Sequence, residues 1–332
     1  MKIKLKPDFK KRWVTIAIVI IILLGIYVRL VGFHWPYLRN IDSYLYYRHM
    51  KDIVENGNLP ERDMLTMVPE GKETHPGYYF YEYLGAYSYN FFHIFFPNMQ
   101  LWQFLVWFPP LLASLMAIPM YYIGKTVYDR RAGVLAAFLI VFSPPMVSRS
   151  LGGDPDSDAI VMLLPLITIA LFLYTYKHLN KEKLLDRKNI IFSIITGIAL
   201  TAFSYTWPGF WYTFWIILGF VIIKLIIDII STKFNVKKFY QNQKSLLFSF
   251  IIIFLTFSLL TYPYFGVQNI NVAVNSPISM AGLFGSEIKK EQTTGSQFPN
   301  VYVSVAELVS GGGVESIAKQ TFGANTDAMP AL

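Results

Sequence analysis

The stretch Ser148-Arg-Ser-Leu-Gly-Gly-Asp-Pro-Asp-Ser-Asp158 separates two long apolar segments of this chain. It contains three carboxylates and one arginine, and its two glycines and one proline rule out a regular helix. Charge this dense is expensive at the edge of a membrane span unless a ligand binds it. The stretch therefore predicts a binding loop between two spans, suited to a divalent cation, a phosphorylated substrate or both.

The composition of the whole chain indicates a polytopic membrane protein. Its 332 residues are 54% hydrophobic and 17% aromatic. Its apolar runs are long enough to cross about 30 Å of hydrocarbon. The absence of cysteine excludes a disulfide framework and a thiolate metal site. The net charge of +8 comes largely from Lys and Arg residues in short loops beside the apolar runs, which indicates membrane topology and no nucleic-acid partner.

Seven apolar runs predict membrane-spanning helices, and the connections between them alternate between basic and weakly charged. The runs cover residues 13–28, 103–124, 132–147, 159–176, 189–206, 208–230 and 245–262. Because the basic flank Met1–Arg12 favours the cytoplasm, we expect a multi-pass cell-membrane protein with a cytoplasmic N-terminus. Every basic connection then faces inward, and the acidic loop faces outward.

The segment Gly77–Phe96 leaves one point of this topology open. It is long enough to span, but Glu82 and many tyrosines also fit a helix that lies in the membrane interface. If it spans, the basic N-terminus must be exported. We therefore predict a transmembrane domain over residues 1–262, in which the external loop 33–102 contains interfacial helices, and a further external loop over residues 263–332.

Four carboxylates fall in three of the predicted external segments: Asp42, Asp156, Asp158 and Glu307. Hard oxygen ligands of this kind suit Mg²⁺ or Mn²⁺, and such a cation can hold the phosphate of a lipid-linked substrate. Arg149 is a fork-shaped donor suited to the same phosphate. The sequence thus predicts a cation and phosphate site on the external side.

Each of these carboxylates also has a simpler interpretation. Asp156 or Asp158 suits the cap of the helix that follows the loop, and Asp42 suits the cap of a helix over Tyr44–Met50. Glu307 suits a solvated position. Spacing alone leaves both interpretations open.

The chain resembles the catalytic subunit of oligosaccharyltransferase, in particular the archaeal single-subunit form. That family shows Ser-Arg-Ser-x-x-Gly-x-x-Asp-x-(Asp/Glu/His) in its second external loop, which matches Ser148–Asp158 and selects Asp156 and Asp158. Its first external loop carries Asp-x-Tyr-x-Tyr-x-Arg, which is similar to Asp42–Arg48. A late Ser-Val-Ser-Glu motif resembles Ser304–Glu307.

The resemblance implies an all-α polytopic helical bundle of the polyprenyl-phosphate-sugar glycosyltransferase type, with long external loops. It also implies transfer of an oligosaccharide from a dolichol-type phosphate or pyrophosphate to the Asn of an Asn-x-Ser/Thr acceptor. The partners would be the lipid-linked donor, the acceptor protein or peptide, and membrane lipids. The implied metal ligands are Asp42, Asp156, Asp158 and Glu307, binding Mn²⁺ or Mg²⁺, and the implied catalytic residues are Asp42, Glu307 and Arg149.

Two departures limit the resemblance to the N-terminal transmembrane part of the family. The sequence contains no Trp-Trp-Asp-Tyr-Gly motif, and seven spans precede Glu307 where the family has nine. We expect that the C-terminal soluble domain is absent, that the missing half is a separate partner, and that this piece alone is inactive.

Two other functions stay open at this point. One is a polyprenyl-phosphate-sugar glycosyltransferase that acts on Ser/Thr hydroxyls or on lipid, for which Glu307 is dispensable. The other is a transporter or flippase, which usually carries ionisable residues deep in its spans. The centres of the predicted spans contain none, so transport is the weaker alternative.

Overall fold

A computed structural model describes residues 9–34, 37–66, 68–180, 184 and 186–280. The described chain is helical apart from one small two-stranded sheet, as predicted for an all-α polytopic membrane protein. Its helices are α1 (Phe9–Leu30), α2 (Ile41–Asn56), α3 (Phe80–Phe95), α4 (Leu101–Leu115), α5 (Ala117–Val127), α6 (Arg130–Phe142), α7 (Pro144–Ser148), α8 (Asp158–Lys177), α9 (Arg187–Ser204), α10 (Trp211–Ser231), α11 (Val236–Phe265) and α12 (Gln268–Met280). The sheet pairs β1 (Arg62–Asp63) with β2 (Lys72–Glu73), and short 3₁₀ turns form η1 (Pro76–Tyr78) and η2 (Pro208–Phe210).

Two compact units divide the chain, Met1–Ala273 and Val274–Leu332. All the long helices and the loop around Ser148–Asp158 belong to the first unit. The predicted strand-like segment at 300–308 lies outside the described residues.

Five helical segments of the described chain are long and apolar enough to cross a membrane. They are Arg12–Leu30, Leu101–Val127, Asp158–Lys177, Pro208–Ser231 and Val236–Phe265. Each coincides with one predicted span. The other two predicted spans fall on α6, which has 13 residues, and on α9, which begins with Arg187 and Lys188. The crossing of the membrane by α6 and α9 stays a prediction.

The span Leu101–Val127 is interrupted where α4 ends and α5 begins. Pro119 has no backbone N–H, and its ring clashes with the carbonyl four residues earlier, that of Leu115. Leu115 is the last residue of α4, so the sequence accounts for the position of the break. The prediction of one helix over 103–124 missed it.

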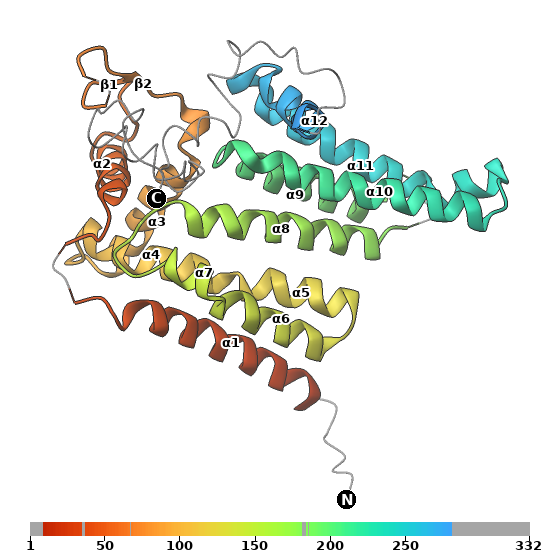
Figure 1. The fold of residues 1–332 in the computed structure, drawn as a ribbon, viewed down its shortest axis with the longest axis horizontal. Coiled ribbons are helices and arrows are strands. Elements are labelled where there is room, and N and C mark those ends of the chain that lie inside the picture. Colours follow the sequence, from red (N-terminus) through yellow and green to blue (C-terminus); the bar gives the residue numbers. More distant parts are fainter. Residues whose placement is uncertain (1–8, 35–36, 67, 181–183, 185, 281–332) are drawn as a thin grey trace, which may run out of the picture. The chain divides into compact units, whose positions relative to one another are not determined.

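The connections of the bundle lie at two opposite ends (Figure 1). The α5–α6, α8–α9 and α10–α11 connections, which carry the basic residues, lie at the end where α1 begins. The α2 and α3 helices, the small sheet and the α7–α8 connection lie at the other end. The charge alternation read from the sequence therefore corresponds to two ends of one bundle.

The segment predicted to lie in the interface forms η1 and α3. The α3 helix has 16 residues, about 24 Å of helix, and is not among the five segments suited to spanning. One of its faces packs on α2 and α4, with Tyr81, Glu82 and Tyr89 buried, while Tyr87 and Phe91 are exposed. This geometry favours the interfacial interpretation of Gly77–Phe96.

Candidate functional site

The acidic loop between α7 and α8 packs against the end of α1. The amide of Gly152 donates to the Arg29 carbonyl at 2.9 Å. A Cβ atom at Gly152 would lie 2.8 Å from Leu30 Cδ2 and 3.3 Å from the Arg29 carbonyl oxygen, so a side chain here would require Leu30 to move. Gly153 has a φ of +81°, and a Cβ there would lie 2.2 Å from the ring of Phe33. The paired glycines of the motif thus place the loop on α1.

The side chain of Arg29 completes this contact from inside the bundle. Its Nε donates to Ser150 Oγ at 2.7 Å, and both residues are buried. Sequence analysis did not select Arg29, because an arginine at the end of an apolar run ordinarily lies at the membrane surface.

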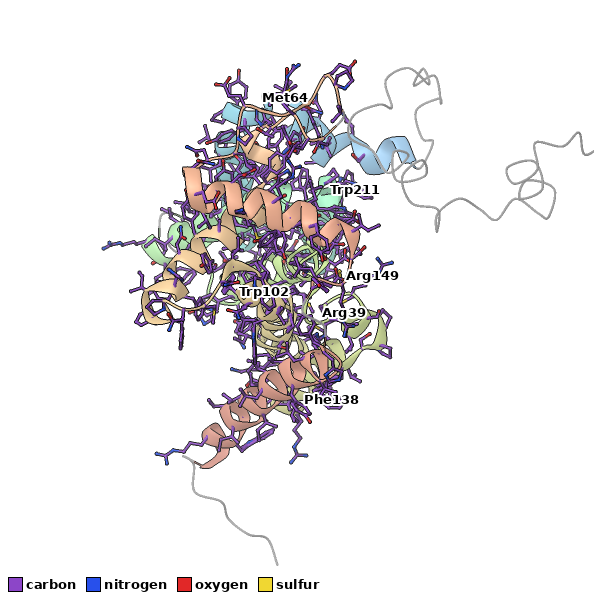
Figure 2. All side chains as sticks on the ribbon, turned by 90° about the vertical axis from the view of Figure 1, so that its left-hand side faces the viewer. Arg39, Met64, Trp102, Phe138, Arg149 and Trp211 are labelled. Atoms are coloured by element: carbon purple, nitrogen blue, oxygen red, sulfur yellow. The ribbon has the colours of Figure 1, made fainter. Side chains whose placement is uncertain are left out.

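The other side of the acidic loop is held by α2. Ser43 Oγ donates to Asp154 Oδ1 at 2.9 Å, and the Tyr46 hydroxyl donates to Ser157 Oγ at 3.2 Å. Ser43 and Tyr46 are three residues apart and therefore lie on one face of the helix. These contacts bring the helix that carries Asp42 beside the loop that carries the acidic pair. Figure 2 shows this part of the molecule with Arg39 and Arg149 labelled.

Burial and neighbouring charges shift the pKa values of side chains in the acidic loop and on α2. The pKa of Asp154 is raised, first by burial and then by the nearby carboxylates of Asp156 and Asp42, while the hydrogen bond from Ser43 opposes the shift. The pKa of Tyr46 is raised by burial and by the negative charge of Asp156. The Asp42 side chain itself is exposed in the first turn of α2. Several carboxylates therefore act on one another across the α2–loop contact.

Arg149 lies at the exposed edge of the same loop. Its Nη1 is 3.8 Å from Asp158 Oδ2, and both side chains are substantially exposed. An ion pair of this kind contributes little to stability because water screens it. The guanidinium thus lies beside the acidic pair at the surface of the loop.

The capping interpretations are only partly supported. The N-cap of α2 is Asn40, so Asp42 is not the cap and instead lies in the first turn. The N-cap of α8 is Ser157, so neither Asp156 nor Asp158 occupies that position. Carboxylates in a first turn still interact favourably with the helix dipole.

The described residues by themselves do not form a complete metal site. In this part of the chain, no three His, Asp or Glu side chains are close enough together to hold an ion. Glu307, the fourth predicted ligand, lies outside the described residues. The α2 helix, which carries Asp42, contacts the loop that carries Asp156 and Asp158, and the roles of these three residues stay predictions.

A largely buried ionic cluster further along α2 was not expected from the sequence. Arg48 forms a bidentate pair with Asp63, with Nη1–Oδ1 and Nη2–Oδ2 distances of 2.6 Å. His49 lies between Asp63, at 3.3 Å, and Glu82 of α3, at 3.6 Å. The Arg48 pair holds the pKa of Asp63 well below its usual range. The cluster fixes α2, and with it Asp42, against the small sheet and α3.

Comparisons with known proteins agree with the resemblance seen in the sequence. The family described as "Oligosaccharyl transferase STT3, N-terminal" matches residues 13–310. The dolichyl-phosphooligosaccharide-protein glycotransferase of Methanococcus voltae is 25% identical over 299 residues, which cover 82% of this chain and 31% of that protein. The chain thus spans about a third of the length of this curated relative.

Two solved structures from Archaeoglobus fulgidus share the fold. One is the archaeal oligosaccharyltransferase AglB in complex with an inhibitory peptide and a dolichol-phosphate, with a TM-score of 0.66 and 21% identity over 91% of this chain and 37% of that one. The other is an oligosaccharyltransferase complex with zinc and sulfate, with a TM-score of 0.56 and 20% identity over 81% of this chain and 39% of that one.

Proposed function

This chain belongs to the oligosaccharyl transferase STT3 family through its match to the N-terminal part, and we propose that it supplies the acidic membrane site of a glycosyltransferase. The reaction is transfer of an oligosaccharide from a dolichol-type phosphate or pyrophosphate to the Asn of an Asn-x-Ser/Thr acceptor. The curated relative from Methanococcus voltae supports this activity by its name.

One observation carries the proposal. The hydrogen bonds Ser43–Asp154 and Tyr46–Ser157 hold the first turn of α2 beside the acidic loop, although the residues of each pair are 111 positions apart. A merely structural loop has no need to gather like-charged carboxylates, since their repulsion is unfavourable. A bound cation, alone or together with a phosphate, would offset this repulsion between the carboxylates. Their clustering therefore favours a cation site.

The donor set fits a hard divalent cation. Asp42, Asp156 and Asp158, with Glu307 from the later segment, would hold it through carboxylate oxygens, which Mn²⁺ and Mg²⁺ accept. When bound, the cation supplies positive charge for a departing phosphate. The Archaeoglobus fulgidus structure with zinc and sulfate supports a divalent cation and an anion on this fold.

The side chains of this protein would activate the acceptor amide and bind the phosphate of the donor. An acceptor amide is a poor nucleophile, because its nitrogen lone pair is conjugated with the carbonyl. Asp42 and Glu307 would accept hydrogen bonds from the amide N–H groups and turn the nitrogen out of that conjugation. Arg149 would donate to a phosphate oxygen of the donor, since its exposed guanidinium lies beside the acidic pair.

The similarity to the solved structure of AglB supports a choice of substrates. The AglB structure holds a dolichol-phosphate and an inhibitory peptide, which supports a lipid-linked donor and a peptide acceptor here. We place the α2, α3 and acidic-loop end of the bundle on the external face, with the N-terminus in the cytoplasm, because the basic connections lie at the other end.

The proposal is tested by the chemistry of the acceptor. A chimera would continue this chain with the remaining part of the Methanococcus voltae relative, and it would be incubated with a lipid-linked oligosaccharide and an Asn-x-Thr peptide. We expect mass spectrometry to find the glycan on Asn, and none on the matched Gln-x-Thr peptide. A glycan on a Ser or Thr hydroxyl would instead establish the alternative glycosyltransferase.

A further inference from the structure

We propose that Arg29 is a positioning residue for the acidic loop, acting through Ser150 to fix the loop that carries Asp156 and Asp158. The inference rests on the proposed function, since it assigns Arg29 a role in the affinity of that site for a divalent cation.

The Arg29 guanidinium binds three oxygen atoms from three parts of the bundle. Nε donates to Ser150 Oγ at 2.7 Å, Nη1 to the Gly25 carbonyl at 3.0 Å, and Nη2 to the Val141 carbonyl at 2.8 Å. Gly25 belongs to α1 and Val141 to the last turn of α6, while Ser150 belongs to the acidic loop. One side chain therefore links α1, α6 and the loop.

The burial of Arg29 excludes the ordinary role of an arginine at a helix end. Such a side chain usually extends along the apolar surface so that its charge reaches water or lipid headgroups. Arg29 has 0% of its surface exposed, and no carboxylate in the described part of the chain lies within ion-pair distance of it. A buried charge without a counter-ion is unfavourable, so its retention on three neutral acceptors indicates a function.

The shape of the guanidinium suits this role better than any other cation. Its planar fork directs donors to several acceptors at once, whereas a lysine ammonium is a compact point charge. A lysine at this position would offer one nitrogen atom in place of the three that donate to Ser150, Gly25 and Val141. The arrangement thus depends on geometry as well as on charge.

The backbone of Arg29 strengthens the same contact. Its carbonyl accepts from the Gly152 amide at 2.9 Å, and a Cβ atom at Gly152 would lie only 3.3 Å from that carbonyl oxygen. The loop is thus held on one side by α1 and on the other by Ser43 and Tyr46 of α2. Loss of the guanidinium would remove the contact between α1 and the loop at Ser150, six residues before Asp156.

The test measures binding of Mn²⁺ alone to the whole chain in lipid nanodiscs, followed by electron paramagnetic resonance of the free ion. The variants are Arg29→Met, Arg29→Lys and the milder Ser150→Ala, which keeps the arginine and removes one acceptor. Arg12→Met is the matched control, because Arg12 is an exposed arginine at the other end of the same span. We expect the three variants to weaken Mn²⁺ affinity by about tenfold or more, as loss of a hydrogen bond to a charged group predicts.

Hydrogen–deuterium exchange separates positioning from general destabilisation. We expect faster exchange of the amides of residues 150–157 in Ser150→Ala and Arg29→Met, with unchanged exchange in α9 and α11. Wild-type Mn²⁺ affinity in both of these variants would overturn the role of Arg29 and leave the proposed function intact. Faster exchange throughout the bundle in these variants would indicate general destabilisation, and it would also overturn the positioning role of Arg29. No Mn²⁺ binding by the wild type would overturn the proposed metal site and this inference together.

Discussion

Ser43 Oγ lies 2.9 Å from Asp154 Oδ1, and this hydrogen bond joins the helix that carries Asp42 to the loop that carries the acidic pair. The two residues are 111 positions apart, so the contact depends on the packing of the whole bundle. It also opposes the rise in the pKa of Asp154 that burial and neighbouring carboxylates cause. The contact is thus a structural link between α2 and the acidic loop.

Removal of that link should loosen the loop without unfolding the bundle. In Ser43→Ala, Asp154 loses a donor to a charged group, which costs about 1.5–3 kcal/mol. We expect faster amide exchange in residues 153–157 and little change in α8 beyond its first turn. Tyr44→Phe, a conservative change at the next residue, is the control, and equal exchange in both variants would contradict the role of Ser43.

Gly153 should tolerate no side chain. Gly153→Ala combines a left-handed backbone with a Cβ 2.2 Å from Phe33, so we expect a loss of more than about 2 kcal/mol. Gly57 has the same φ of +81° with no atom near its Cβ, so Gly57→Ala should cost only about 1 kcal/mol. Thermal unfolding followed by fluorescence measures both. Equal melting temperatures of Gly153→Ala and Gly57→Ala would show that Phe33 does not restrict the backbone of the loop.

The Arg48–Asp63 pair should make the protein sensitive to acid. The pKa of Asp63 is depressed in the folded protein, first by Arg48 and also by Thr66 and His49, against the effect of burial. Stability from this pair is therefore fully present above the ordinary value of 3.8 and is lost as pH falls through the folded pKa.

Other titratable groups near Asp63 are His49 of α2, Glu82 of α3 and Tyr79, which precedes α3. To isolate Asp63, the melting temperature of Asp63→Asn is compared with that of the wild type between pH 7 and pH 3. We expect Asp63→Asn to be less stable at neutral pH and to lose less stability on acidification. Parallel curves would show that Asp63 does not cause the acid sensitivity.

Substitution of the predicted ligands should abolish transfer and leave insertion intact. In the chimera described above, Asp42→Ala and Asp156→Ala should lower the rate of glycopeptide formation by about a hundredfold or more. Glu55→Ala, an exposed carboxylate later in α2, is the control and should keep the wild-type rate. Normal transfer by both aspartate variants would refute the assignment.

The helical architecture was predictable from local sequence, because apolar runs and charged connections act at short range. The family resemblance was equally readable from Ser148–Asp158. The interruption at Met116 was missed because this run contains three prolines, and Pro109 and Pro110 lie within α4 without ending it. The interfacial interpretation of Gly77–Phe96 rested on tyrosine content and is supported by the length and one-sided burial of α3.

The contacts that build the site were not predictable, because they join distant segments. Nothing near Arg29 in the sequence indicates that Ser150 and Val141 surround it. His49 is buried because it lies on the face of α2 that packs against α3, together with Met50 and Ile53. The sequence shows this face only as a weak pattern of apolar residues. Asp42 and the acidic pair were selected by motif, and Tyr46 is a motif position as well, but the contact that Ser43 makes with Asp154 was not indicated by any motif.

Binding of Mn²⁺ to the detergent-solubilised chain tests the central claim most directly, by comparing the wild type with Asp156→Ala/Asp158→Ala. Glu55→Ala/Glu70→Ala is the matched control, because it removes two exposed carboxylates outside the acidic loop. We expect saturable binding by the wild type and the control, and loss of binding in the Asp156→Ala/Asp158→Ala variant. Undiminished binding by that variant would contradict it, and Asp156 and Asp158 would then be residues that only stabilise the start of α8.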